Sequence, residues 1–275
     1  MFRSPRKGFT LKELLVVLLI VGLGIGLMLP NVRRVREPAA RALCANNLKQ
    51  MILAMNDYDD SGRPAPNPST GSANSPVVQA FPPGCFGPGA TPEERLSWAI
   101  ALLPYLEQDP LYRQFDLEKG YAGNLPAAQT RLKLFICPTS KEATMADALT
   151  NYVAMAGIGL EAATQPAGAP GNGFMGYDRV TSIAMIKDGT SNTIGLMETR
   201  VDLGPWARGG ASTVRGFDPA DLPPIGDNRP FGGHKGGVNA GMLDGSVRFI
   251  PAKIDPKKLA AAITIAGGES VDLNY

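Results

Sequence analysis

The sequence predicts an α+β protein, with one long N-terminal helix and a globular head that contains an antiparallel sheet. An apolar run followed by an amphipathic stretch, which reaches about Asp60, predicts the long helix. Near the C-terminus, two apolar-rich runs flank Asp244-Gly245, which is a strong signal for a β-hairpin. The chain has 275 residues, enough for one large domain or two ordinary ones.

The N-terminus carries the longest hydrophobic stretch. Residues 1–8 (MFRSPRKG) are polar and basic, and the chain is apolar without a break from Leu14 to Leu29. With Phe9 and Leu11 the stretch reaches about 20 residues, which is the length that spans a bilayer as a helix. We therefore predict a transmembrane helix over residues 9–29.

Two simple interpretations of this start fit poorly. An ordinary secretory signal peptide ends at a small-residue cleavage site, and the nearby A-x-A at residues 40–42 lies well past the apolar run and behind several arginines. A plain membrane anchor leaves Glu13 unexplained, because a carboxylate deep in a membrane costs about 2.5 kcal/mol or more.

The string GFTLKE at residues 8–13, followed by the apolar run, closely resembles the type IV prepilin signal. The resemblance implies that residues 1–8 are a leader, and that a prepilin peptidase cuts after Gly8 and N-methylates Phe9. It also implies that Glu13 meets the amine of Phe9 in a neighbouring subunit, since opposite charges in a layer of low dielectric constant attract strongly. Lys12 departs from the apolar residue usual at that position.

The second half of the predicted helix, residues 30–60, has apolar residues at helical spacing and should form a spine packed on the head. Gly22, Gly24 and Gly26 are expected to loosen the helix, Pro30 follows soon after them, and Pro38 predicts a second kink. The resemblance to pilin-like proteins implies that the helix bends or melts in this stretch. Gly22 and Gly26 also form a G-x-x-x-G, which could pack against another helix.

Residues 61–275 are predicted to form the head, and high glycine and proline contents predict long loops in it. We expect a loop at 61–90, one or two short helices at 96–115, strands at 131–138, 151–158, 179–186 and 192–198, a long loop at 203–237, a hairpin at 237–243 and 246–250, and a last helix at 256–264.

Several short sequence strings follow one another in a recognisable order from the predicted helix to the C-terminal hairpin. REPAARALCANNLKQ, FPPG, SWAIALLPYLEQDPLYRQFD, FICP, TNYVAMAG and DGTSNTI are followed by His234, nine residues, and Asp244-Gly245. This order resembles a large family of prepilin-leader proteins with a domain of unknown function and a C-terminal H-x9-D-G motif, abundant in planctomycete-type bacteria. The resemblance implies a pseudopilin-like architecture, in which a helical spine carries an α+β head with an antiparallel sheet. The resemblance therefore predicts the architecture and leaves the biochemical role open.

His234 is the only histidine, and it could be a base, a metal ligand or a structural hydrogen-bonding group. A general base needs a nucleophile, and no G-x-S-x-G is present. We therefore favour a structural role, with the ring bonded to the backbone or to Asp244. Asp244 is expected to cap the hairpin turn and Gly245 to supply its positive φ.

The sequence predicts no cofactor. Calcium is an alternative, because some secretion pseudopilins, which this chain resembles, hold Ca²⁺ in a loop of the head. Asp218, Asp221 and Asp227 are weak candidate ligands, but no EF-hand spacing is present. Asp188, Asn192 and Glu198 could form a polar network. We interpret these residues as stabilising a turn and not as a binding site.

The three cysteines, Cys44, Cys85 and Cys137, form no C-x-x-C pair, which gives little support to a zinc or thioredoxin-like site. If the head is exported, one disulfide with one thiol left over is an alternative to three buried thiols. The sequence leaves the pairing open.

The leading hypothesis is a structural, non-enzymatic subunit of a type II secretion-like or type IV pilus-like assembly in the inner membrane. It crosses the membrane once, exports its head, and has prepilin peptidase and other pilin-like subunits as partners. The alternatives are a surface protein whose head binds a polymer or a protein partner, with residues 203–237 as the contact surface, and an anchored hydrolase. A net charge of +2 argues against nucleic acid as a partner, and basic residues on both flanks of the apolar run leave the topology undecided.

Overall fold

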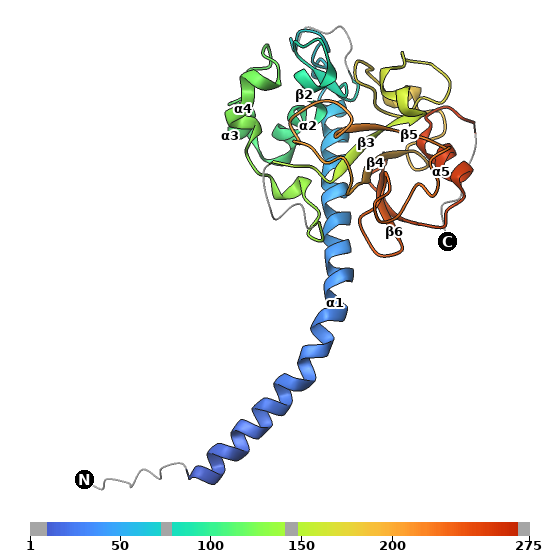
Figure 1. The fold of residues 1–275 in the computed structure, drawn as a ribbon. Coiled ribbons are helices and arrows are strands. Elements are labelled where there is room, and N and C mark those ends of the chain that lie inside the picture. Colours follow the sequence, from blue (N-terminus) through green and yellow to red (C-terminus); the bar gives the residue numbers. More distant parts are fainter. Residues whose placement is uncertain (1–9, 73–78, 141–147, 269–275) are drawn as a thin grey trace. The chain divides into compact units, whose positions relative to one another are not determined.

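The computed structural model describes residues 10–72, 79–140 and 148–268, without the side chains of residues 25–36. The predicted leader and Phe9 lie outside the described residues. The chain divides into two compact units, Met1–Ala40 and Arg41–Tyr275, and the helix α1 (Leu11–Asp60) runs through both (Figure 1). The head unit is a mixture of helix and sheet, so the predicted α+β class is confirmed.

Helix α1 begins at a capping box. The Thr10 backbone N–H and hydroxyl donate to Glu13 Oε2 at 2.8 and 2.9 Å, and the Glu13 N–H donates to Thr10 Oγ1 at 3.4 Å. The helix then continues without interruption through Gly22, Pro30 and Pro38. We expected the helix to bend or melt near Pro30. It does not melt, because one proline removes one backbone hydrogen bond and the neighbouring turns still continue the helix.

Among the described residues, no helix has the length and apolar character that a membrane crossing requires. The predicted transmembrane helix at 9–29 extends beyond the described side chains at both of its ends.

The second half of α1 is strongly amphipathic and belongs to the head unit. Leu48, Met51, Ile52 and Met55 are fully buried, whereas Leu43 on the opposite face is 55% exposed. Polar groups of the helix also form hydrogen bonds with the C-terminal hairpin. Asn56 Nδ2 donates to the Leu243 carbonyl at 3.2 Å, and Asn239 Nδ2 donates to the Arg41 carbonyl at 3.2 Å. The apolar residues on one face of the spine between Cys44 and Tyr58 are therefore part of the core of the head.

A five-stranded sheet in the order β5-β3-β4-β6-β7 forms the centre of the head, and its neighbours are antiparallel except for the β3–β5 pair. The strands are β3 (Tyr152–Ile158), β4 (Ile194–Glu198), β5 (Val214–Phe217), β6 (Gly237–Met242) and β7 (Val247–Pro251). The predicted strands at 151–158 and 192–198 and the C-terminal hairpin are confirmed.

The two faces of the sheet enter different hydrophobic clusters. Tyr152, Ala154 and Ala156 of β3 join the cluster that contains the buried residues of α1. Val153 and Met155, which alternate with them, join the cluster that contains the C-terminal helix α5 (Pro256–Ile263). The sheet is therefore covered by helix on both sides, which explains why nearly every residue of the inner strands β3, β4 and β6 is buried (Figure 1).

Two predicted strands are wrong. Residues 133–135 form the 3-10 helix η4 (Lys133–Phe135), and residues 183–185 form η7 (Ile183–Met185). Both segments are apolar enough for a strand, but η4 is followed by Pro138 and η7 is closed by i→i+3 hydrogen bonds from Met185 and Ile186.

The remaining elements are short. They are β1 (Cys85–Phe86) paired with β2 (Leu96–Ser97), η1 (Pro92–Glu94), α2 (Trp98–Ala101), η2 (Leu103–Leu106), α3 (Asp109–Tyr112), η3 (Tyr121–Asn124), α4 (Leu125–Ala128) and η6 (Leu160–Thr164). The helices predicted at 96–115 and 256–264 are confirmed.

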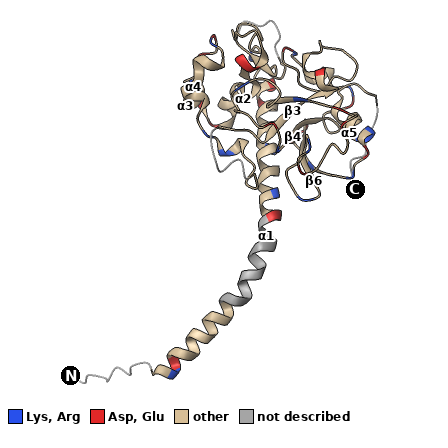
Figure 2. Cartoon of the chain, in the orientation of Figure 1, with Lys and Arg blue, Asp and Glu red and all other residues tan. Residues whose placement is uncertain are grey.

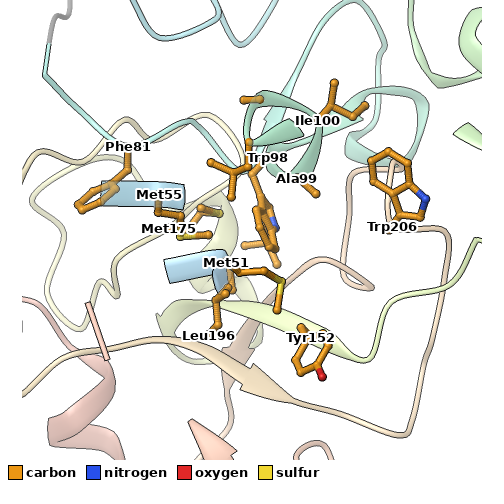
Figure 3. Packing of buried hydrophobic residues seen from close by; sticks show 14 of the residues in the cluster. Met51, Met55, Phe81, Trp98, Ala99, Ile100, Tyr152, Met175, Leu196 and Trp206 are labelled. Carbon is orange, nitrogen blue, oxygen red and sulfur yellow. The ribbon is translucent and has the colours of Figure 1, made fainter. Parts of the chain in front are cut away.

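These short elements place aromatic residues against α1. Figure 3 shows Met51 and Met55 of α1 among Trp98, Met175 and Leu196. The Trp98 indole N–H is satisfied by the Thr213 carbonyl at 2.9 Å, so the ring can be buried without losing a hydrogen bond.

We expect Leu48→Ala to lower the free energy of unfolding by about 2–5 kcal/mol, because it leaves a cavity between α1 and the sheet. Leu43→Ala, the same change on the exposed face of the same helix, should cost less than about 0.5 kcal/mol. Urea unfolding of the full chain in detergent measures both values. Equal effects of the two substitutions would contradict the one-sided packing of α1.

Candidate functional site

Four chemically versatile side chains meet in the head from four separate segments. Cys44 lies on α1, Cys137 follows η4, Glu198 ends β4, and His234 precedes β6. Their ligand atoms all lie within 4.8 Å of one another, and all four residues are buried. We call these residues the Cys–Glu–His cluster.

The closest contact in the cluster joins the two sulfur atoms. Cys44 Sγ and Cys137 Sγ are 2.7 Å apart. His234 Nε2 lies 4.0 Å from Cys137 Sγ and 3.4 Å from Glu198 Oε1. The same imidazole nitrogen therefore faces both the thiol and the carboxylate.

Backbone and amide groups hold the Glu198 carboxylate in place. Asn239 donates its backbone N–H to Oε2 at 2.8 Å and its side-chain amide to Oε1 at 3.1 Å. Gly233 lies so close that a Cβ there would be 2.6 Å from Oε2, so only glycine fits. His234 is positioned by two backbone hydrogen bonds with Gly237, at 3.3 and 3.2 Å.

The loop that carries Cys137 is equally well fixed. The Cys137 N–H donates to Asn151 Oδ1 at 2.9 Å, and Thr139 Oγ1 lies 3.1 Å from Cys137 Sγ. Arg200 donates to Thr139 Oγ1 at 2.6 Å and also to the Gly233 carbonyl. One guanidinium thus links the Cys137 loop to the segment before His234.

The surroundings shift the pKa values of the two thiols in opposite directions. The contact with Cys44 lowers the pKa of Cys137, burial opposes that shift, and His234 and Thr139 lower the pKa further. The contact with Cys137, together with burial, raises the pKa of Cys44. Cys137 is therefore the more acidic thiol of the pair.

This arrangement does not match a cysteine–histidine hydrolase. In such a relay the nucleophile and the orienting carboxylate contact opposite nitrogens of the imidazole. Here Glu198 and Cys137 face the same nitrogen, and Cys137 is 1% exposed. Two other kinds of chemistry remain. The four donors could hold a zinc ion, since thiolate, imidazole and carboxylate are its usual ligands, and the two sulfurs could form a disulfide.

The other predicted site residues lie apart from this cluster. Asp244 Oδ1 accepts from the Ser246 N–H at 2.8 Å and from its hydroxyl at 2.6 Å, and Gly245 has φ 88°, so the turn chemistry expected of both is confirmed. The His234 ring, for which we considered a bond to Asp244, faces Glu198 and Cys137 instead.

The candidate calcium ligands do not converge. Asp218 accepts from the Ala220 N–H at 2.9 Å, Asp221 pairs with Arg229, and Asp227 is exposed. Within residues 10–72, 79–140 and 148–268, the set of ligand atoms close enough for a metal ion is the Cys–Glu–His cluster.

Sequence reasoning missed the role of Glu198. We interpreted it as part of turn chemistry, but it ends a buried strand and its side chain is 0% exposed. A carboxylate at the end of the apolar run IGLME is itself a signal, because a buried acid needs a partner. The partners come from residues 234 and 239, which the local sequence does not indicate.

The processing and assembly residues occur at the other end of the chain. Gly8 and Phe9 lie outside the described residues. Glu13 is exposed and forms the capping box with Thr10.

Two family models match the chain. Residues 3–29 match the prokaryotic N-terminal methylation motif, and residues 33–222 match a protein family of unknown function (DUF1559). The first match contains Gly8, Phe9 and Glu13, and the second contains three members of the Cys–Glu–His cluster. No curated protein and no solved structure matched the chain.

We expect Glu198→Gln to lower the free energy of unfolding by about 1–3 kcal/mol, because an amide nitrogen would face the donors of Asn239. Glu161→Gln, the same change at an exposed position, is the matched control and should have little effect. Thermal unfolding of both variants measures the difference. If Glu198→Gln had the same unfolding temperature as the wild-type chain, the hydrogen bonds of the Glu198 carboxylate would contribute nothing to stability.

Proposed function

Because this chain belongs to the DUF1559 family and begins with a prokaryotic N-terminal methylation motif, we propose that it is a pilin-like structural subunit of a type II secretion-like or type IV pilus-like assembly. The observation that carries the proposal is the match of residues 3–29, which contains the cleavage glycine, the aromatic residue to be methylated and Glu13 at their required spacing. In this proposal the subunit sits in the inner membrane with its head exported.

The surface of the first unit supports assembly through α1. Charge is confined to the start of the described helix, at Lys12 and Glu13, and no charged residue follows up to Gly24 (Figure 2). Apolar side chains on every side of this stretch are exposed, from Leu11 at 75% to Leu23 at 64%. An exposed apolar helix surface of this length needs lipid or neighbouring helices around it.

Glu13 has a different partner before and after assembly in this proposal. In the single chain its carboxylate accepts from the Thr10 N–H and hydroxyl. In the assembly it would also face the Phe9 amine of a neighbouring subunit, which offsets the cost of placing either charge in a layer of low dielectric constant. The charge of Glu13 and its capping role are therefore separate functions of one side chain.

The proposal includes no catalytic activity for the head. The burial of Cys137 and the single imidazole nitrogen shared by Glu198 and Cys137 support this part.

A binding role for the head is the second candidate, and one feature favours it. A cavity of about 390 Å³ is lined by residues of η6, of β5 and of the loop at 218–231, including Leu160, Phe217 and Pro230. It lies along the segment expected to serve as a contact surface. Co-sedimentation of the full chain with insoluble cell-wall polymer tests this candidate, and a chain that stays in solution would count against a polymer ligand.

We expect Glu13→Gln to abolish assembly without preventing processing. Glutamine at this position keeps the capping box but removes the charge, so helix formation and charge pairing are separated. Lys12→Gln is the matched control, which removes the adjacent charge and should leave assembly intact. Mass spectrometry of the N-terminus and recovery of cross-linked oligomers from the native membrane provide the two measurements. Normal oligomers of the Glu13→Gln variant would contradict the role assigned to Glu13.

A further inference from the structure

The three cysteines of the head have different environments. Cys44 and Cys137 are separated by 93 positions in the chain, yet their sulfur atoms are 2.7 Å apart, closer than the van der Waals contact of two non-bonded sulfur atoms. Cys85 is buried elsewhere, on β1, against Gly209. The fold therefore singles out one pair and one isolated thiol.

We propose that Cys44 and Cys137 form a disulfide bond that ties α1 covalently to the head, and that Cys85 remains a buried thiol. The inference rests on the proposed function in one respect, since a stable disulfide of this kind forms in an oxidising compartment and so requires export of the head.

The positions of the two cysteines favour a bond between them. Cys44 lies on the buried face of α1, one turn before Leu48, and Cys137 is held by the bond from its N–H to Asn151. The packing of α1 positions the Cys44 sulfur, and the hydrogen bond to Asn151 positions the loop that carries the Cys137 sulfur. Neither depends on the contact between the two sulfur atoms. A covalent bond then requires a sulfur–sulfur distance of about 2 Å, a small further approach from the observed contact.

A zinc ion fits this geometry less well. Two sulfurs at about 2.3 Å from a tetrahedral zinc ion lie about 3.8 Å apart, roughly 1 Å farther than the observed contact. Charge gives a second argument. Two thiolates and the Glu198 carboxylate around one dication would leave a net negative charge in a buried site, whereas a disulfide leaves the carboxylate paired with His234 and Asn239.

The oxidation is a thiol–disulfide exchange with an exported oxidoreductase that carries a reactive disulfide. The Cys137 thiolate attacks one sulfur of that disulfide, which forms a mixed disulfide and releases the first oxidoreductase thiolate. The Cys44 thiolate then attacks the Cys137 sulfur and releases the second. Two electrons pass from the cysteine pair to the oxidoreductase, whose two thiolates take up the two protons.

Burial determines when this reaction occurs and how long its product lasts. Cys44 and Cys137 are 0% and 1% exposed, so the exchange must take place before the head closes around α1. Once closed, the head shields the bond from reductants. The product joins α1 covalently to the loop of the head that follows η4.

The test is peptide mapping of the full chain isolated from its native membrane, alkylated under denaturing but non-reducing conditions. The expected result is a linked Cys44–Cys137 peptide and alkylation of Cys85 alone. Alkylation of all three cysteines on chains that start at methylated Phe9 would overturn the proposal. So would one zinc ion per chain together with two reduced thiols at these positions.

A second arm does not depend on export. The reduced full chain is refolded in detergent with oxidised glutathione, and the same linked peptide is expected. Chains from the membrane that still start at Met1 would count against the proposed function, whereas failure to form the link in this arm counts against the disulfide.

Variants provide an independent readout. Reduction of the unfolded chain in denaturant, followed by refolding with reductant present, should lower the Tm of the wild-type chain by about 10 °C relative to the oxidised chain and should act equally on the control Cys85→Ser. The same treatment should leave the Tm of Cys44→Ser and of Cys137→Ser unchanged, and the double variant should be little less stable than either one. Equal Tm values for the oxidised wild-type chain and the chain reduced in denaturant would overturn the proposal.

Discussion

The burial of one face of α1 against the sheet of the head is the interaction on which the rest of the structure depends. Ile52 approaches the sheet where β4 and β6 carry glycines. A Cβ on Gly195 would lie 3.0 Å from Ile52 Cδ1, and one on Gly241 would lie 2.9 Å from Ile52 Cγ1. Because these two strand positions carry no side chain, the Ile52 side chain of α1 packs directly against the strand backbone there.

This packing makes α1 an internal part of the head as well as its spine. The buried face of α1 and the face of the sheet that carries Tyr152 and Ala154 belong to one hydrophobic cluster. Removal of the helix would expose that face, so the head is expected to fold only around its own spine. The Cys–Glu–His cluster also depends on this helix, because Cys44 lies on the buried face of α1.

The sequence predicted those parts of the molecule that are encoded by local periodicity. The long helix and the hairpin at Asp244-Gly245 follow from helical spacing and from a two-residue turn signal. Strand β5 has four residues and lies among glycines, so its pattern is too short to be recognised, and η4 has an apolar run that also suits a strand. The cluster could not be predicted, because residues 44, 137, 198 and 234 are brought together by tertiary contacts alone. The position of Glu13 behind the leader glycine is a local pattern, and it was recognised for that reason.

Hydrogen exchange of the full chain in detergent, followed by mass spectrometry, tests most directly whether α1 is part of the core of the head. Amides of α1 between Cys44 and Tyr58 should exchange as slowly as those of β3 and β4, because both open only when the whole head unfolds. Rapid exchange of this segment while the sheet remains protected would show that the helix is a detachable spine, and it would contradict the burial of α1 as the basis of the fold.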